Sequence, residues 1–188
     1  MIRARRWAAG LSALLLGALL AAPPATALDR PTGPVVLTVA GAITETNRGP
    51  YDERVDVFFK YHEVSFERAA AFDATMLEAL GMHEITVAYA DRPEQDRFAG
   101  PRLRDVLGAA GFTGDEIKVL ALDAYAEELT RADLDAYEWI LSMERNGEAF
   151  GIGQFGPLRL VYARHDDKPI TAEDEARWPW AVFYIEIR

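Results

Sequence analysis

Cysteine is absent from the 188 residues of this chain, and histidine occurs only three times. Without a thiol there is no disulfide, no thiolate nucleophile, no iron–sulfur cluster and no cysteine-ligated metal. His62, His83 and His165 do not have the spacing of a zinc motif on one helix. Surface or structural histidines are therefore the simpler interpretation, and a site that brings the three together in space stays open as the alternative.

Basic residues are also scarce, with 20 Lys and Arg against 30 Asp and Glu. Three of the basic residues and none of the acidic ones precede Leu28, so the rest of the chain carries 17 minus 30, or −13. This charge argues against nucleic acid and anionic membrane surfaces as partners, because both repel a strongly acidic protein. Solubility is the simplest reason for the acidity.

Long apolar runs are missing except near the start of the chain. Arg3, Arg5 and Arg6 precede an apolar run over residues 8–22, and Ala25-Thr26-Ala27 fits the small-x-small rule for cleavage. The run is short for a membrane span. We therefore expect residues 1–27 to be a secretory signal peptide, so that no membrane span is left after cleavage. The product would be exported, and periplasmic if the source is a Gram-negative bacterium.

Short strands and helices are predicted along the remaining chain, residues 28–188, which has the length of one domain. Asp73 can cap a short helix, and Thr130 with Asp133 resembles a capping box. Asn146-Gly147 is the strongest hairpin signal. Hydrophobic patterning favours strands at 35–40, 117–122, 125–129, 137–143, 158–162 and 181–187, and a helical turn at 171–176. The pattern over 55–66 fits neither the period of a strand nor that of a helix. This order predicts an α+β fold with a few short helices.

The stretch from His83 to Gly111 is predicted to be a strand, a loop and a helix. Ile85, Val87 and Tyr89 alternate with more polar residues, as in a strand with one buried face. A polar loop is expected from Tyr89 to Gly100, and Pro101 suits the first turn of a helix over 101–110. Loops between a strand and a helix often hold ligands. This one offers Asp91, Arg92 and Arg97 but no obvious nucleophile.

Four blocks, in order, resemble the oxidoreductase molybdopterin-binding domain, which has the fold of sulfite oxidase. They are Phe98-x-Gly100-x-x-Leu103-x-Asp105-Val106-Leu107 followed by Gly111, then Asp123-Ala124-Tyr125, then Met143–Glu148 with Asn146-Gly147, and finally Gly156-Pro157-Leu158-Arg159-Leu160-Val161-Tyr162. The resemblance covers roughly Val35 to the end. It implies a mixed sheet with a few short helices. The chain also resembles a set of short, exported, stand-alone members of the family that lack the enzymes' partner domains.

The chain departs from this family at the metal ligand. In the family's enzymes a cysteine before the aromatic-x-Gly block binds molybdenum, whereas this chain has Ala88 or Tyr89 there. A methyl or a phenol cannot replace a thiolate without changing the chemistry. Asp91-Arg92 lies near the family's Asn-Arg, which suggests that part of a pocket survives.

Two functions follow from these observations. The first is an exported, non-catalytic module that binds a small anionic ligand, or an exported or membrane-bound partner protein, on a reused enzyme fold. The second is a molybdopterin-dependent oxidoreductase with atypical metal ligation, which the lack of cysteine disfavours.

The first function assigns no catalytic residue and no metal ligand. Its predicted ligand-binding residues are Tyr89, Asp91, Arg92, Arg97 and Arg159, with Arg159 placed by the resemblance. The arginines suit bidentate recognition of phosphate or carboxylate, and Tyr89 could cover a flat ring. Surface pairing with the many acidic residues is an equally simple role for Arg97. Trp178 and Trp180 could stack on a flat ligand, although packing at a sheet edge is the simpler interpretation.

Overall fold

The computed structural model describes residues 28–164, 166 and 168–188, so the predicted signal peptide and His165 lie outside the described residues. The fold is α+β and combines mixed and antiparallel sheets with short helices, as predicted. No helix of the described part is long and apolar enough to cross a membrane.

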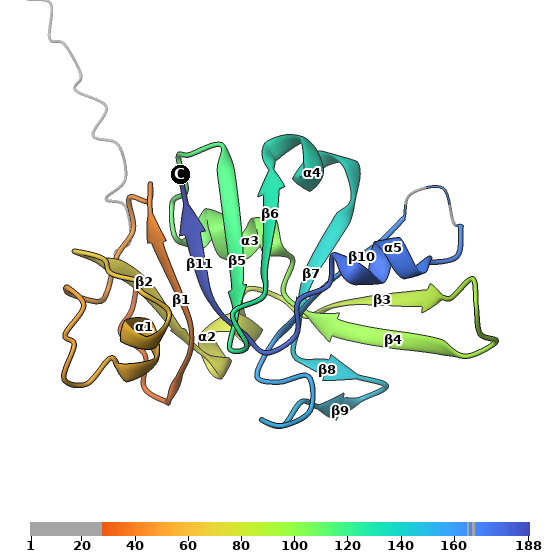
Figure 1. Cartoon of the computed structure of the whole chain (residues 1–188), viewed down its shortest axis with the longest axis horizontal. Helices are drawn as coiled ribbons and strands as arrows, with labels where there is room; N and C mark the ends of the chain where they lie inside the picture. The colour runs from red at the N-terminus through yellow and green to blue at the C-terminus, as the bar shows by residue number, and fades with distance from the viewer. Residues whose placement is uncertain (1–27, 165, 167) are drawn as a thin grey trace, which may run out of the picture.

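A five-stranded sheet with the order β2-β1-β11-β5-β6 forms one end of the molecule (Figure 1). Its strands are β1 (Val35–Gly41), β2 (Ala69–Asp73), β5 (Glu116–Ala121), β6 (Ala126–Thr130) and β11 (Val182–Ile187). The pair β1–β11 is parallel and the other pairs are antiparallel, so the sheet is mixed. The first and last strands of the described chain therefore lie side by side.

Two smaller sheets form the other end of the molecule. One has the order β3-β4-β8-β9, from β3 (His83–Ala88), β4 (Gln95–Gly100), β8 (Glu144–Arg145) and β9 (Glu148–Ala149). The other pairs β7 (Glu138–Ser142) with β10 (Arg159–Ala163). The backbone N–H of Leu141 donates to Pro101 O at 2.9 Å, so β7 is also tied to the end of β4. A Cβ on Gly100 would lie 2.2 Å from Leu141 O, and this close approach requires glycine.

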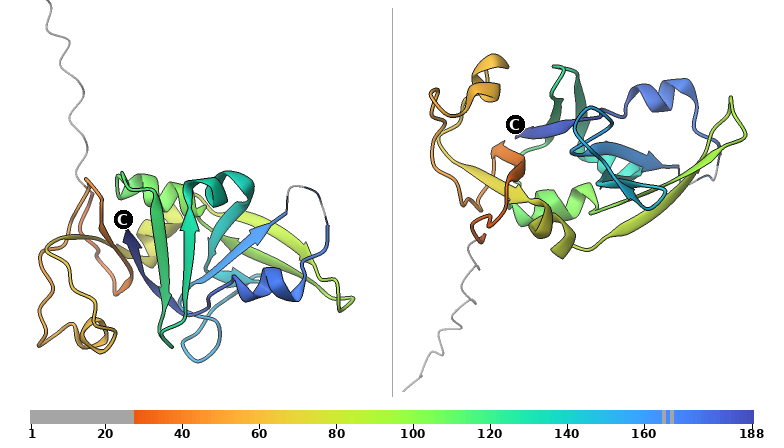
Figure 2. Two further views of the ribbon diagram at one scale, coloured as in Figure 1. Left: turned by 45° about the horizontal axis from the view of Figure 1, so that its top comes forward. Right: turned by 90° about the horizontal axis from the view of Figure 1, so that it is seen from below.

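The helices lie on both sides of these strands (Figure 2). They are α1 (Val57–Tyr61), α2 (Ala74–Ala79), α3 (Leu103–Ala109), α4 (Arg131–Ala136) and α5 (Ala172–Ala176). Figure 2 shows α2 and α3 on one side and α1 and α5 on the other. The ambiguous range 55–66 thus contains a short helix rather than a strand.

The predicted helix and turn signals are confirmed. Asp73 accepts a hydrogen bond from the N–H of Met76 at the start of α2. Thr130 with Asp133 forms the capping box of α4. Asn146 and Gly147 have φ angles of 57° and 83°, which suit the tight turn between β8 and β9.

The prediction of a loop from Tyr89 to Gly100 is wrong, because half of this range forms strand β4. Asp96 and Phe98 point inward and Arg97 points outward, so the alternation of a strand is present. The buried face of β4 carries the carboxylate of Asp96, so the residues do not alternate between apolar and polar and the hydrophobic pattern of a strand is lost. Pro101 is also not in the helix: Arg102 is the N-cap residue and α3 begins at Leu103.

One large cluster of buried side chains joins the sheets and α3. Leu107, Phe98 and Ile185 belong to it and are fully buried. The ring of Phe98 packs edge-on against Trp178, with centroids 6.0 Å apart. This cluster fixes the base of β4 and the segment before β11, on which the candidate site is built.

Leu107→Ala tests the packing of α3. Because Leu107 has 0% exposure, its truncation should lower the free energy of unfolding by about 2–5 kcal/mol, the range for a buried leucine. Val55→Ala is the matched control: Val55 is 74% exposed, and its truncation should change stability by less than about 0.5 kcal/mol. Urea unfolding of both variants measures the difference. A loss below about 0.5 kcal/mol for Leu107→Ala would show that α3 is not packed as described.

Candidate functional site

A buried carboxylate, Asp96, joins three side chains at the β3–β4 hairpin. Tyr89 Oη donates to Asp96 Oδ2 at 2.8 Å, and Asn146 Nδ2 donates to Asp96 Oδ1 at 2.9 Å. Arg145 Nη2 lies 2.8 Å from Asp96 Oδ2. Arg145 reaches this position because β8 pairs with β4, placing it opposite Phe98. Two of the partners of Asp96 thus come from the end of β8, which supplies Arg145, and from the turn that follows it, which supplies Asn146.

Ionisation at this network follows from burial and hydrogen bonding. Burial alone would raise the pKa of Asp96, but hydrogen bonds from Arg145, Asn146 and Tyr89 outweigh it and lower the pKa. The pKa of Tyr89 is raised to about 12, first by burial and then by its hydrogen bond to Asp96. At neutral pH the carboxylate is therefore charged and the phenol is protonated.

Arg92 lies over the ring of Tyr89 and binds Glu175. Its Cζ is 3.4 Å from the centre of the Tyr89 ring. Its Nη1 and Nη2 atoms donate to the two carboxylate oxygens of Glu175 at 2.9 and 2.8 Å. Glu175 is held in place because α5 starts with a capping box between Thr171 and Asp174. Two predicted site residues, Tyr89 and Arg92, are thus brought together, but Arg92 already has a carboxylate partner.

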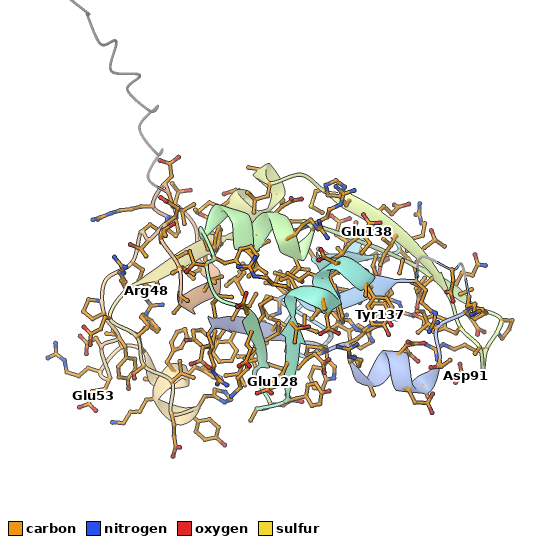
Figure 3. All side chains as sticks on the ribbon, turned by 90° about the horizontal axis from the view of Figure 1, so that it is seen from above. Arg48, Glu53, Asp91, Glu128, Tyr137 and Glu138 are labelled. Atoms are coloured by element: carbon orange, nitrogen blue, oxygen red, sulfur yellow. The ribbon has the colours of Figure 1, made fainter. Side chains whose placement is uncertain are left out.

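Asp91 and Arg97 lie at the edge of this arrangement or outside it. Asp91 is exposed near α5 (Figure 3) and pairs with Arg92 at 3.2 Å. Arg97 is on the outer face of β4 and pairs with Glu84 across the hairpin at 3.6 Å. Both members of the Arg97 pair are more than half exposed, so the pair contributes little to stability. The structure therefore does not bring Arg97 to the other predicted residues.

Arg159, at the start of β10, is the most unusual of the predicted residues because it is only 8% exposed. Its Cζ lies 4.4 Å from the ring centre of Phe155, 5.4 Å from that of Phe98 and 5.5 Å from that of Trp178. Within the described residues, no carboxylate forms an ion pair with it and nothing accepts a hydrogen bond from its Nε. Burial lowers the pKa of Arg159, and the opposing influence of the Glu175 and Asp96 charges does not outweigh it.

Two more buried donors near Arg159 lack an acceptor among the described residues. They are Nε of Arg145 and Nε1 of Trp178. The Phe155 ring connects the two arginines in space, since the Arg145 Cζ is 5.8 Å from its centre. Buried polar groups in proteins are nearly always paired, so three orphan N–H donors in one neighbourhood call for an acceptor.

The three arginines of this cluster differ in their partners. Arg92 pairs with Asp91 and Glu175, and Arg145 pairs with Asp96. Among the described residues, Arg159 alone of the three has no carboxylate partner of its own. Its guanidinium is therefore the group that could take an anion as a partner.

A surface hollow of about 330 Å³ opens next to Arg159. Its walls include Tyr125 from the β5–β6 turn and the segment before β11. The side chains that line it include Tyr125, Phe155, Arg159, Glu175, Trp178 and Trp180. Trp178 is 2% exposed and belongs to the core, as predicted, whereas Trp180 is 44% exposed and belongs to the wall.

Sequence reasoning missed Arg145 and Phe155 as parts of this neighbourhood. Arg145 precedes the recognised turn, but only the pairing of β8 with β4 shows that it faces Asp96. Trp178 was considered as a stacking residue and as a core residue, and its orphan indole N–H has no signal in the sequence.

The residues at this site do not fit a molybdenum centre of the family that the sequence resembles. Ala88 offers no ligand atom, and the phenol of Tyr89 is buried and donates to Asp96. The described residues also contain no group of three or more His, Asp and Glu side chains placed to hold a metal ion. We therefore derive no chemistry through a molybdenum cofactor.

A scan against protein-family models finds no match to the chain, and a search of curated proteins finds none either.

The Asp96 network predicts a pH-dependent stability. Because its folded-state pKa is lowered, Asp96 contributes stability that is present above the unfolded-state pKa of about 3.9 and lost as the pH falls through the folded-state value. Asp96→Asn should lower the free energy of unfolding at neutral pH by about 1–3 kcal/mol, the scale of hydrogen bonds to a charged group. The difference from the wild type should shrink below about pH 4.

Chemical unfolding between neutral and acid pH measures this effect. Glu53→Gln is the control, since Glu53 is an exposed carboxylate paired only with Lys60. If Asp96→Asn and the control gave the same profile, the network would not stabilise the hairpin.

Proposed function

We propose that this chain is an exported binding module that holds a small anionic ligand at Arg159 and catalyses no reaction. The observation that carries the proposal is the buried guanidinium of Arg159, with which no carboxylate of the described residues forms an ion pair. Export rests on the predicted signal peptide. The fold of the molybdopterin-binding domain is part of the same proposal and rests on the four sequence blocks.

The energetics support an anion rather than a purely structural role. Burying a charge costs several kcal/mol even after the protein relaxes. The three rings around Arg159 offset part of this, since a desolvated cation–π contact contributes about 2 kcal/mol. Their faces satisfy none of the directional N–H donors. A bound oxyanion would neutralise the charge and accept hydrogen bonds, and guanidinium groups suit this geometry.

Binding without catalysis is favoured by the chemistry of the side chains. The carboxylate of Asp96 is ionised and fully hydrogen-bonded, and the phenol of Tyr89 has a raised pKa. Neither is poised to exchange a proton near neutral pH, as a general acid or base would be. The oxidoreductase alternative has the four sequence blocks in its favour, and the missing thiolate opposes it.

Arg159→Leu tests the proposal. The wild type should be stabilised by acetate in thermal unfolding, because a ligand that binds the folded state raises its stability. Arg159→Leu should fold, since replacing a buried charge by an apolar group is often neutral or stabilising, and it should lose the anion effect. Arg97→Leu is the matched control and should keep it, because Arg97 pairs on the outer face of β4.

Equal stabilisation of the wild type and Arg159→Leu at matched ionic strength would contradict the proposal. Stoichiometric molybdenum in protein purified from the exported fraction of its host, together with sulfite or sulfoxide turnover, would restore the oxidoreductase alternative.

A further inference from the structure

We propose that the ligand is an aromatic monoanion, such as an aromatic carboxylate, whose charged head binds Arg159 and whose ring lies against Trp180 and Tyr125. This inference rests on the proposed function and specifies the class of ligand that the same site binds. Its basis is the aromatic wall of the hollow beside Arg159, which an inorganic anion would not use.

The aromatic wall is assembled from separate parts of the chain. Tyr125 comes from the turn between β5 and β6, and its hydroxyl donates to Ala176 O at 2.6 Å, which fixes the ring beside the end of α5. Trp180 comes from the segment that precedes β11. Both rings are 44% exposed, so each has surface free to contact a ligand. Flat aromatic side chains stack favourably on aromatic ligands.

The backbone fixes the wall relative to the charge. Arg159 and Trp180 face each other in an isolated antiparallel bridge, and Leu160 N donates to Pro179 O at 2.9 Å. Trp178, before Pro179, is 2% exposed, and Trp180, after it, is 44% exposed, and both line the hollow beside Arg159. This backbone pairing therefore places the guanidinium of Arg159 and the exposed ring of Trp180 in the lining of one hollow.

The charges at the rim favour a single negative charge on the ligand. Glu175 and Asp123 both line the hollow, so a dianion would be repelled by two carboxylates. Of the three nearby arginines, Arg159 alone has no carboxylate partner of its own among the described residues. A carboxylate or sulfonate monoanion matches its single positive charge, whereas a phosphate dianion exceeds it.

The apolar character of the wall also disfavours very small anions. A ligand as small as acetate would reach Arg159 and leave Trp180 and Tyr125 in water. A ring attached to the carboxylate would bury part of both aromatic faces and gain the corresponding hydrophobic and stacking free energy. The structure thus predicts a preference that grows with the aromatic surface of the ligand.

Calorimetric titration with benzoate, acetate and sulfate at constant ionic strength tests the inference. Benzoate should bind roughly tenfold more tightly than acetate, because stacking and ring burial add to the charge interaction. Trp180→Ala should remove most of this preference and leave acetate binding unchanged. Tyr61→Ala is the control, since Tyr61 is an exposed aromatic residue on α1 and should leave all three affinities unchanged.

The outcomes separate the two proposals. If benzoate, acetate and sulfate bind equally, and Arg159→Leu abolishes all three, the aromatic inference is overturned while the anion site stands. If none of the three anions binds the wild type, both the aromatic inference and the proposed function are overturned. A benzoate preference that survives in Trp180→Ala would also contradict the assignment of the ring to this wall.

Discussion

The guanidinium of Arg159 is buried among aromatic rings, and this placement constrains the whole neighbourhood. Phe98, Phe155 and Trp178 surround it, each from a different part of the chain. A charge in such surroundings must be compensated by something, because its transfer from water costs several kcal/mol. The nearby carboxylates Asp96 and Glu175 form ion pairs with Arg145 and Arg92, respectively. Arg159 is therefore left without an ion-pair partner among the described residues, and this is the basis for proposing an external anion at this site.

The fold keeps these groups in place through a few tight backbone contacts. Gly100 lets the end of β4 approach β7, and β7 in turn pairs with β10, which starts at Arg159. The segment before β11 hydrogen-bonds to β10 and brings Trp178 under the guanidinium and Trp180 to the surface. The ion pair with Asp96 fixes Arg145 near the Phe155 ring. The site is thus preorganised by sheet pairing, which reduces the ordering that a ligand would have to impose.

Much of the fold could be predicted from the sequence because local chemistry dictates it. Asp73, Thr130 and Asn146-Gly147 act within a few residues, so their caps and turn were recognisable. Strand β4 was missed because its buried face carries Asp96, whose partners come from β3 and from the β8–β9 turn. Such compensation exists only in the folded chain and leaves no periodic hydrophobic signal.

The candidate site was predictable only in part, for the same reason. Arg92 and Tyr89 were singled out and do lie together, and Arg159 lies close to them. Arg97 was grouped with them by proximity in sequence, but strand alternation turns it to the other face.

The nuclear magnetic resonance signals of the Arg159 Nε–H and the Trp178 indole N–H test the central claim most directly. Both should shift together and saturate as benzoate is added, with the exposed Arg97 signal as reference; two signals that stay unchanged throughout the titration would contradict an anion site at Arg159.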